Sequence, residues 1–474
     1  MCREFSYLQL TVVAGRETIN ILPDDVLLII FYFDGPEDDN RLWYPSWHRL
    51  VHVCRRWRSL VFASPNFLDL RLVFDPRTRV ELAGIWPPFP IIIKNFTNWP
   101  FPEIDATIVH RDRVREIDVF LSRLQLQRLI SAMREPFPAL THIRLGLNRN
   151  GGVPPVLPDD FLGGCALRLQ SLELQSISFP ALPKFLLSAV NLVDITLWDT
   201  LHSTYISPET LVTCLAVLAN LKFLSIEFHS SSPSHPDRVR QHPLPPARIV
   251  LPSLVHFKFV WVSEYLEDLV DRIDAPLLDS VCIIFFYEYV FNIPEFGRFL
   301  RRTPKFQTLN EAHVDFDRYG VLVSPLPPTW IFGRSPGLRI RIQVPNWRFS
   351  YMAHTLASLF PSVYMVEHLY IYGSHAPYLL KYWRKTINGI RWLEIFHPFT
   401  AVKNLYLRKE IAQYISPVLQ ELEEESVTNV LPVLEGIFVE EVGPSGPIQV
   451  AIGKFVAARQ LLGHPVAVSL WNGT

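Results

Sequence analysis

The sequence predicts an α/β protein in which a short helical module is followed by a long array of repeated strand and helix units. Two observations support this prediction. Residues 21–65 carry apolar residues at the three- and four-residue spacing of helices, and a strand-sized apolar signature then recurs through most of the 474-residue chain. Because each unit can bury its apolar face only against its neighbours, we expect a solenoid with parallel strands on the concave face and helices outside.

The first helix is predicted to begin at Leu22-Pro23. Proline suits the first turn of a helix, where its missing N–H would be unpaired anyway, and Asp24 and Asp25 favour the positive end of the helix dipole. Apolar residues at helical spacing continue to residue 33, which gives about three turns.

A second helix is predicted from about Ser46 to Ala63, after an acidic loop over residues 34–44. Its apolar residues lie on one face, and Ser64-Pro65 ends it. Two such short helices cannot bury both apolar faces by themselves, since a module of about 40 residues is marginally stable without a partner. The surplus apolar surface therefore indicates a docking module.

These residues resemble the F-box in the runs LPDDVL (22–27), IF (30–31), VCRRW (53–57) and SP (64–65). The resemblance implies binding to the Skp-type adaptor of an SCF ubiquitin ligase and, through it, to a cullin. The adaptor-binding residues that it implies are Leu22, Pro23, Ile30, Val53, Cys54 and Trp57. The loop at 34–44 is longer than is usual in that family. The alternative is an ordinary helical hairpin packed on its own domain.

The repeated signature is L-x-x-φ-x-φ, where φ is an apolar residue. Its copies begin at positions 114, 140, 169, 192, 221, 254, 278, 366, 402 and 434, and the first seven are 23 to 33 residues apart. Two weaker copies are expected in the long gap, at 306–309 and 338–342. Segments of helical periodicity lie between the copies, at 208–218, 264–273, 294–302, 350–360 and 409–422.

The repeats resemble leucine-rich repeats, although the asparagine that usually follows the strand is mostly absent. Large fungal families of F-box proteins combine an early F-box, irregular proline-led repeats and a tryptophan near the C-terminus, and Gly463 to Trp471 is interpreted as a closing strand. The expected organisation is an N-terminal tail (1–17), an F-box (18–66) and a divergent leucine-rich-repeat solenoid (67–474). A proline- and serine-rich loop at 229–250 interrupts the solenoid, and a tolerated insertion is favoured over a regulatory loop.

Composition argues against several classes of protein. A net charge of −1 gives no basic footprint for nucleic acid. The five scattered cysteines form no CxxC pair, which argues against a disulfide framework and a zinc site. No signal peptide is expected, and the longest apolar run, residues 281–293, is too short to span a membrane. We therefore expect a cytoplasmic or nuclear protein.

No catalytic motif is found. The sequence lacks the phosphate-binding, dinucleotide-binding, nucleophile-elbow and zinc-protease patterns. His48 and His52 are four residues apart, but no third ligand accompanies them, so exposure is favoured over a shared metal. We expect no cofactor and no enzymatic activity.

The remaining candidate for a functional site is the concave surface of the predicted solenoid. The residue between the two φ positions should point to the concave face, and aromatic and arginine side chains there suit a protein-binding anchor. The candidate target-binding residues are Trp198, Tyr370, Tyr372, Tyr406 and Arg408.

The sequence therefore predicts a non-catalytic substrate receptor that holds an unidentified protein target near an SCF-type ligase for ubiquitin-dependent degradation. A scaffold that uses the F-box outside a ligase is the first alternative, and an enzyme with an unrecognised site is the second.

Overall fold

The structure is a computed structural model of the whole chain. It describes residues 21–33, 47–74, 86–95, 108–148, 154–200, 205–228, 248–286, 293–307, 310–317, 320–324, 337–343, 365–373, 392–422, 424–440 and 446–471. Two compact units emerge: residues 1–95 with 99–116, and residues 96–98 with 117–474. The predicted tail at 1–17 and helix at 350–360 lie outside the described residues.

The first unit contains the predicted N-terminal helices, with one correction. Helix α1 (Asp24–Phe33) begins directly after Pro23, as predicted. The expected second helix is broken into α2 (Trp47–Leu50) and α3 (Arg55–Ala63). Cys54 between them has an extended backbone, and its Sγ accepts a hydrogen bond from the Trp57 N–H at 3.4 Å. The apolar spacing continues across this N-cap, so periodicity alone could not reveal the break.

Aromatic packing holds this unit together beyond the expected boundary at residue 66. The rings of Phe31 and Trp57 lie 4.6 Å apart between α1 and α3. Trp47 packs edge-on against Phe89 and donates its indole N–H to the Arg71 carbonyl oxygen at 3.3 Å. Strands β1 (Leu72–Phe74) and β2 (Ile91–Asn95), which pair in parallel, therefore belong with the helices.

The second unit is mixed α/β with a large, mostly parallel sheet. Its strands follow the spatial order β3-β4-β5-β6-β7-β9-β11-β14-β13-β12-β15-β16-β17-β18. The strands that carry the signature are β3 (Val114–Leu121), β4 (His142–Leu147), β5 (Ser171–Gln175), β6 (Asp194–Thr200), β7 (Phe223–Phe228), β9 (His256–Trp261), β11 (Ser280–Phe286), β15 (His368–Gly373), β16 (Asn404–Leu407) and β17 (Gly436–Glu440), and β18 (Ala467–Trp471) is the expected closing strand.

The signature positions are in register from strand to strand. Leu172 lies opposite Ile143 and Ile195, and Leu224 lies opposite Ile195 and Phe257. All five side chains are buried. The strand assignments made from the signature are therefore confirmed, including the parallel pairing within this run.

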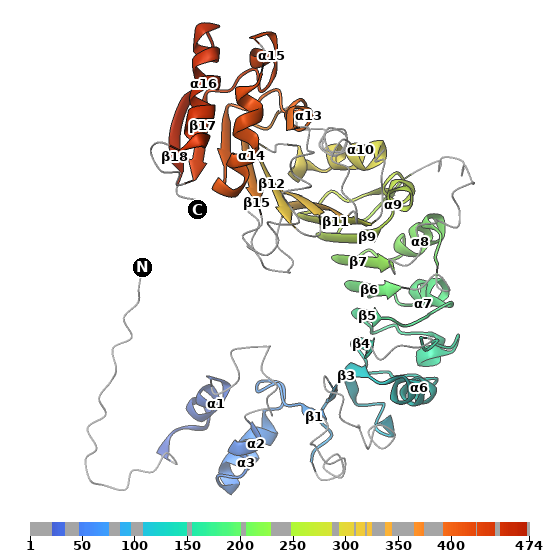
Figure 1. Ribbon diagram of the computed structural model, residues 1–474. Coiled ribbons are helices and arrows are strands. Elements are labelled where there is room, and N and C mark those ends of the chain that lie inside the picture. Colours follow the sequence, from blue (N-terminus) through green and yellow to red (C-terminus); the bar gives the residue numbers. More distant parts are fainter. Residues whose placement is uncertain are drawn as a thin grey trace, which may run out of the picture. The chain divides into compact units, whose positions relative to one another are not determined.

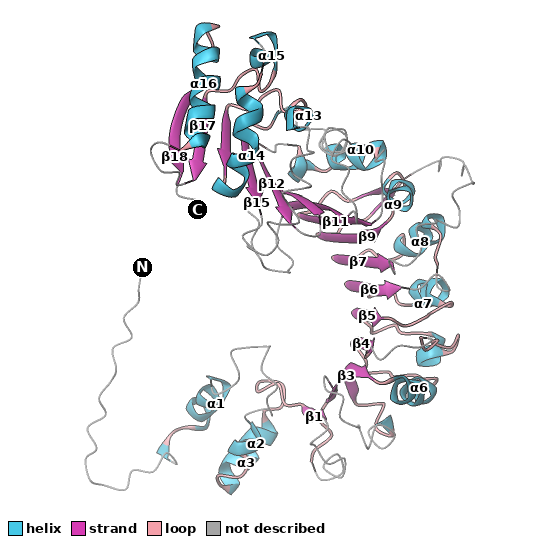
Figure 2. Cartoon of the chain, viewed as in Figure 1, coloured by secondary structure: helices cyan, strands magenta, loops and turns pink. Residues whose placement is uncertain are grey.

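The helices follow the strands along one side of this sheet (Figure 1), and adjacent helices contact each other. Figure 2 shows the same alternation of strand and helix by colour. The helices are α6 (Arg123–Ala132), α7 (Leu182–Ser188), α8 (Pro208–Leu215), α9 (Ser263–Val270), α10 (Pro294–Arg302), α13 (Trp392–Phe396), α14 (Lys409–Gln420), α15 (Glu424–Asn429) and α16 (Pro447–Leu461), with 3₁₀ turns η2 (Phe161–Gly164) and η4 (Pro304–Phe306).

Of the two weaker copies expected between residues 278 and 366, the one at 338–342 is confirmed as a strand, and the one beginning at 306 is wrong. The predicted copy at 306 begins in η4, and the strand there is β12 (Glu311–Asp317). Strands β12, β13 (Gly320–Ser324) and β14 (Gly337–Gln343) pair antiparallel with one another, and we call them the antiparallel insertion. At its two edges, β14 pairs in parallel with β11 and β12 pairs in parallel with β15. Asp317 lies opposite Gly320, so only two residues separate the strands. A connection this short permits antiparallel pairing alone.

The predicted C-terminal bound of the loop at 229–250 is also wrong, because residues 249 and 250 form a strand. Residues 229–247 lie outside the described part, but Ile249 and Val250 form β8, which pairs with β10 (Ile273–Asp274) in a separate two-stranded sheet. Arg248 donates to the Asp271 carbonyl oxygen at 2.8 Å.

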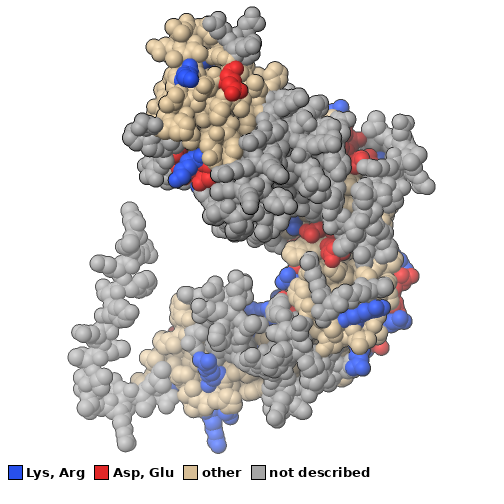
Figure 3. Space-filling view, viewed as in Figure 1, with Lys and Arg blue, Asp and Glu red and all other residues tan. Residues whose placement is uncertain are grey.

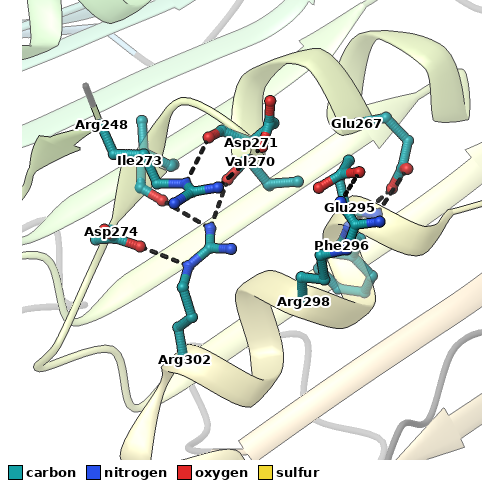
Figure 4. A network of polar contacts seen from close by, with 10 residues as sticks. All are labelled: Arg248, Glu267, Val270, Asp271, Ile273, Asp274, Glu295, Phe296, Arg298 and Arg302. Atoms are coloured by element: carbon teal, nitrogen blue, oxygen red, sulfur yellow. Dashed lines mark hydrogen bonds and ion pairs between the residues drawn. The ribbon is translucent and has the colours of Figure 1, made fainter. Parts of the chain in front are cut away.

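Charged side chains join α9 to α10 at both ends (Figure 4). At the start of α10, the Glu267 carboxyl accepts hydrogen bonds from the backbone N–H groups of Glu295 at 2.9 Å and Phe296 at 2.8 Å. Arg302, in the last turn of α10, donates to Asp274 at 2.6 Å and to the carbonyl oxygen of Val270 at 3.1 Å. Each helix thereby satisfies terminal backbone groups of its neighbour.

We predict a pH dependence from Glu267. Burial raises the pKa of its carboxyl from 4.5 to about 7, outweighing the two N–H donors that favour the charged form. Because the folded carboxyl then binds its proton more tightly than the unfolded one, its contribution to stability is full below pH 4.5 and is lost as the pH rises through about 7. Between these two pH values the wild type should lose about 1–3 kcal/mol of its free energy of unfolding through this carboxyl, and Glu267→Gln should not show that loss.

Urea unfolding of both proteins at the two ends of the window measures this difference. Identical pH dependence in wild type and variant, or a wild type that gains stability relative to the variant as the pH rises, would contradict the expectation.

Candidate functional site

The first unit exposes a set of large apolar side chains around α1 and the turn before α3. Ile30 is 42% exposed and Val53 is 57% exposed. The other large apolar side chains exposed in this part of the unit are Ile21, Ile29, Tyr32, Phe33 and Phe67. We call Ile29, Ile30, Tyr32, Phe33 and Val53 the exposed apolar surface. It is the surplus that the sequence predicted for these helices.

The six predicted adaptor-binding residues divide by burial. Pro23, Ile30 and Val53 are exposed, whereas Leu22 and Cys54 are half-buried. Trp57 is buried against Phe31 and belongs to the core of the unit.

An ion pair fixes the start of α1 against α3. Arg56 bonds the Asp24 carboxylate at 2.6 Å and the Leu22 carbonyl oxygen at 2.6 Å. This double contact explains why an acid directly after Leu22-Pro23 matters for the local structure, because it joins α1, which carries most of the exposed apolar surface, to α3.

In the second unit, the strand registers place a row of side chains on the sheet face opposite the helices. His313, Tyr370, Tyr406 and Phe438 lie opposite one another on β12, β15, β16 and β17. The residues that flank them along the strands, such as Leu369 and Ile371, are buried on the other face. We call these four residues the aromatic ladder.

The rings of the aromatic ladder stack. His313 and Tyr370 have centroids 4.2 Å apart and planes at 5°, and Tyr370 and Tyr406 are 4.1 Å apart at 10°. Phe438 continues the stack 4.6 Å from Tyr406. Since each inner ring contacts a neighbour on both faces, the ladder presents ring edges and hydroxyl groups to a ligand.

A second row lies beside the ladder. Tyr372 is buried and its hydroxyl is 2.8 Å from His313 Nδ1. The Arg408 guanidinium lies 5.3 Å from the Tyr372 ring centroid and 3.8 Å from the Glu440 carboxylate. Trp471 of β18 packs at a steep angle against Tyr370, Tyr372 and Tyr406, with ring centroids 5.6–6.1 Å apart.

Burial keeps these groups neutral. It lowers the pKa of His313 to about 4, and it raises the pKa of Tyr370 and of Tyr372 above the ordinary tyrosine value. Aromatic side chains flanked by the Arg408–Glu440 pair and by Glu311, whose carboxylate lies 3.7 Å from His313 Nε2, suit binding to a folded protein or peptide.

Four of the five predicted target-binding residues therefore come together: Tyr370, Tyr372, Tyr406 and Arg408. Trp198 does not join them, because six strands lie between β6 and β15 in the sheet order. It lies instead beside Lys258, whose Nζ is 5.2 Å from the Trp198 ring and 3.3 Å from the Glu227 carboxylate.

Three members of this site, Phe438, Trp471 and His313, are not among the residues predicted from the sequence. Phe438 occupies the same place in its signature as Tyr370 and Tyr406, so the signal was present. Trp471 was recognised as part of a closing strand but was not assigned to the site. His313 could not be found from the signature, because it arrives on the antiparallel insertion.

Among the described residues, no group of three or more His, Cys, Asp or Glu side chains is arranged to hold a metal ion. None of the helices in the described ranges combines the length and the apolar character needed to cross a bilayer.

Comparison with known proteins adds no relative: no protein-family model matches the chain, and no curated protein matches it.

His313 predicts an acid sensitivity in the second unit. Because its pKa falls from 6.5 to about 4 on folding, the unfolded chain binds the proton first. The contribution of His313 is therefore full above pH 6.5 and is lost as the pH falls through about 4. His313→Gln should show a smaller loss of stability on acidification than wild type, by about 1–3 kcal/mol. An unfolding titration with the same slope for His313→Gln and wild type would contradict this assignment.

Proposed function

We propose that this chain is a non-catalytic substrate receptor of an SCF-type ubiquitin ligase. The first unit binds a Skp-type adaptor through the exposed apolar surface. The sheet face of the second unit that carries the aromatic ladder, which we call the ladder face, binds a protein target. The chain then promotes ubiquitin transfer by proximity and makes or breaks no bond itself.

The observation that supports adaptor binding most directly is the exposed apolar surface beside an F-box-like sequence. Exposed apolar side chains clustered on a small helical unit mark a protein-binding site more often than a solvated surface. Pro23, Ile30 and Val53 match F-box positions and are exposed, so they are available to a partner without unfolding the unit.

Target binding is supported by the ladder face. The repeated strand and helix units resemble leucine-rich repeats, and in such a solenoid the strand face opposite the helices is the binding face. Tyr370, Tyr406, Arg408 and Trp471 place several residues of the types that dominate protein interfaces within one small area.

Adaptor binding is tested with Ile30→Asp and Val53→Asp. Each places a charge on the exposed apolar surface without removing a core residue, so each should weaken binding of a purified Skp-type adaptor at least about tenfold while the unit stays folded. Val109→Asp is the matched control, because Val109 is in the same unit, 73% exposed and outside the surface. Trp57→Ala is a poor test, since loss of a buried tryptophan costs about 3–5 kcal/mol of folding stability.

Calorimetric titration of adaptor into each variant gives the affinities. Unchanged binding by both aspartate variants, or equal weakening by Val109→Asp, would contradict the assignment.

Target binding is tested by comparing what Val53→Asp and Tyr406→Ala capture from cells. Tyr406→Ala opens a gap between Tyr370 and Phe438, so it should lose the target and keep the adaptor. Val53→Asp should show the reverse. Trp198→Ala is the comparison on the other part of the sheet and should lose neither. If every protein captured by wild type is also captured by Tyr406→Ala, the ladder face is not the target site.

The alternative function is a scaffold that binds the adaptor outside a ligase. Purification of the chain from cells distinguishes the two, because a ligase receptor brings a cullin with the adaptor. Adaptor without cullin would favour the scaffold.

A further inference from the structure

Strand β18 ends the sheet order, and no described strand lies on its far side. It pairs in parallel with β17, and the Ala467 N–H donates to the Glu435 carbonyl oxygen at 2.8 Å. In a parallel ladder alternate residues bond to the same neighbour, so Ala467, Ser469 and Trp471 bond toward β17. The N–H and C=O groups of Val468 and Leu470 therefore point out along the open edge, where they can accept another strand.

The side chains at this edge are apolar. Val468 and Leu470 lie opposite Ile437 and Val439, both buried, so they continue the buried layer of the sheet. Nevertheless Val468 is 47% exposed and Leu470 is 67% exposed.

The surrounding surface is almost uncharged. Within residues 446–471 only Lys454 and Arg459 are charged, and Arg459 is buried, donating to the carbonyl oxygens of Val427 at 3.0 Å and Val430 at 3.2 Å. On the face drawn in Figure 3, few charged side chains lie over α16, β17 and β18. A sheet edge that faces water ordinarily carries charged side chains, and β18 carries none.

We propose that β18 pairs with β18 of a second copy of this chain, antiparallel about a two-fold axis at Ser469. Val468 then lies opposite Leu470 of the second copy, and Leu470 opposite Val468. Both are pairs of outward-pointing residues, so each exchanges two hydrogen bonds. The pairing extends one sheet through both copies and covers the exposed apolar side chains.

The sequence of β18 favours its own copy as the occupant. Ala467 falls opposite Trp471, a small side chain against a large one, and Val468 falls opposite Leu470 in the buried layer. A two-fold axis places like surfaces together, which a charged edge would oppose, but AVSLW carries no charge. Registers centred on Val468 or on Leu470 would keep only one outward-pointing pair, so the Ser469 register is the preferred one.

A disulfide reports this register directly. Ser469 faces its own copy in a non-hydrogen-bonded pair, where Cβ atoms lie about 4.5–5.5 Å apart, close enough for Ser469→Cys to cross-link after slight adjustment. In Ala467→Cys the two sulfurs are displaced by four residues, about 13 Å, and cannot meet. Both variants are made with Cys165→Ser, which removes an exposed thiol.

After mild oxidation of the full chain, Ser469→Cys should give a covalent dimer and Ala467→Cys should stay monomeric. No cross-linking in Ser469→Cys, or equal cross-linking in both variants, would overturn the proposal.

Sedimentation of the unmodified chain provides the second measurement. Its average mass should rise from monomer toward dimer as concentration increases about a hundredfold. Leu470→Lys should weaken association at least tenfold with unchanged circular dichroism, whereas Val217→Lys, at another exposed apolar position, should not. A monomer at every concentration would overturn the proposal. Adaptor titration of Leu470→Lys should match wild type, so failure here is distinguishable from failure of the proposed function.

Discussion

The second unit depends on one constraint, the burial of apolar side chains that the strand register places opposite one another. Leu172, Ile195, Leu224 and Phe257 form a continuous buried line across adjacent strands. A slip of one residue would turn every one of these side chains to the other face, at about 1.5–3 kcal/mol for each. The register is therefore fixed by the core, and the opposite face is free to vary.

That freedom accounts for the character of the ladder face. The register that buries Leu369 and Leu405 also places Tyr370 opposite Tyr406, so the ring stack is a consequence of the core rather than a separate feature. The antiparallel insertion likewise determines which ring stacks on Tyr370 of β15. Because β12 rather than β14 lies beside β15, the neighbour of Tyr370 is His313, whose imidazole completes the stack and bonds the Tyr372 hydroxyl.

Much of this arrangement could be predicted from sequence because local pattern determines it. The Leu22-Pro23 helix start, the strand at each signature copy and the closing strand ending at Trp471 each follow from apolar spacing and a few terminating residues. Prediction failed where a local pattern fits two structures. The apolar face of residues 47–61 continues across the Cys54 N-cap. The alternation of Leu338–Ile342 predicts the strand but not its second partner, since one edge pairs in parallel with β11 and the other antiparallel with β13. The same limit explains why His313 was missed, since its neighbours are set by the order of the strands in space.

We propose that the first unit binds the adaptor and the second unit binds the target. Hydrogen–deuterium exchange of the full chain with a purified Skp-type adaptor tests this most directly. We predict that adaptor slows exchange in α1, in α3 and in the turn before α3, and leaves β15 to β17 unchanged. Protection confined to the ladder strands, or no protection in α1 and α3 at saturating adaptor, would contradict it.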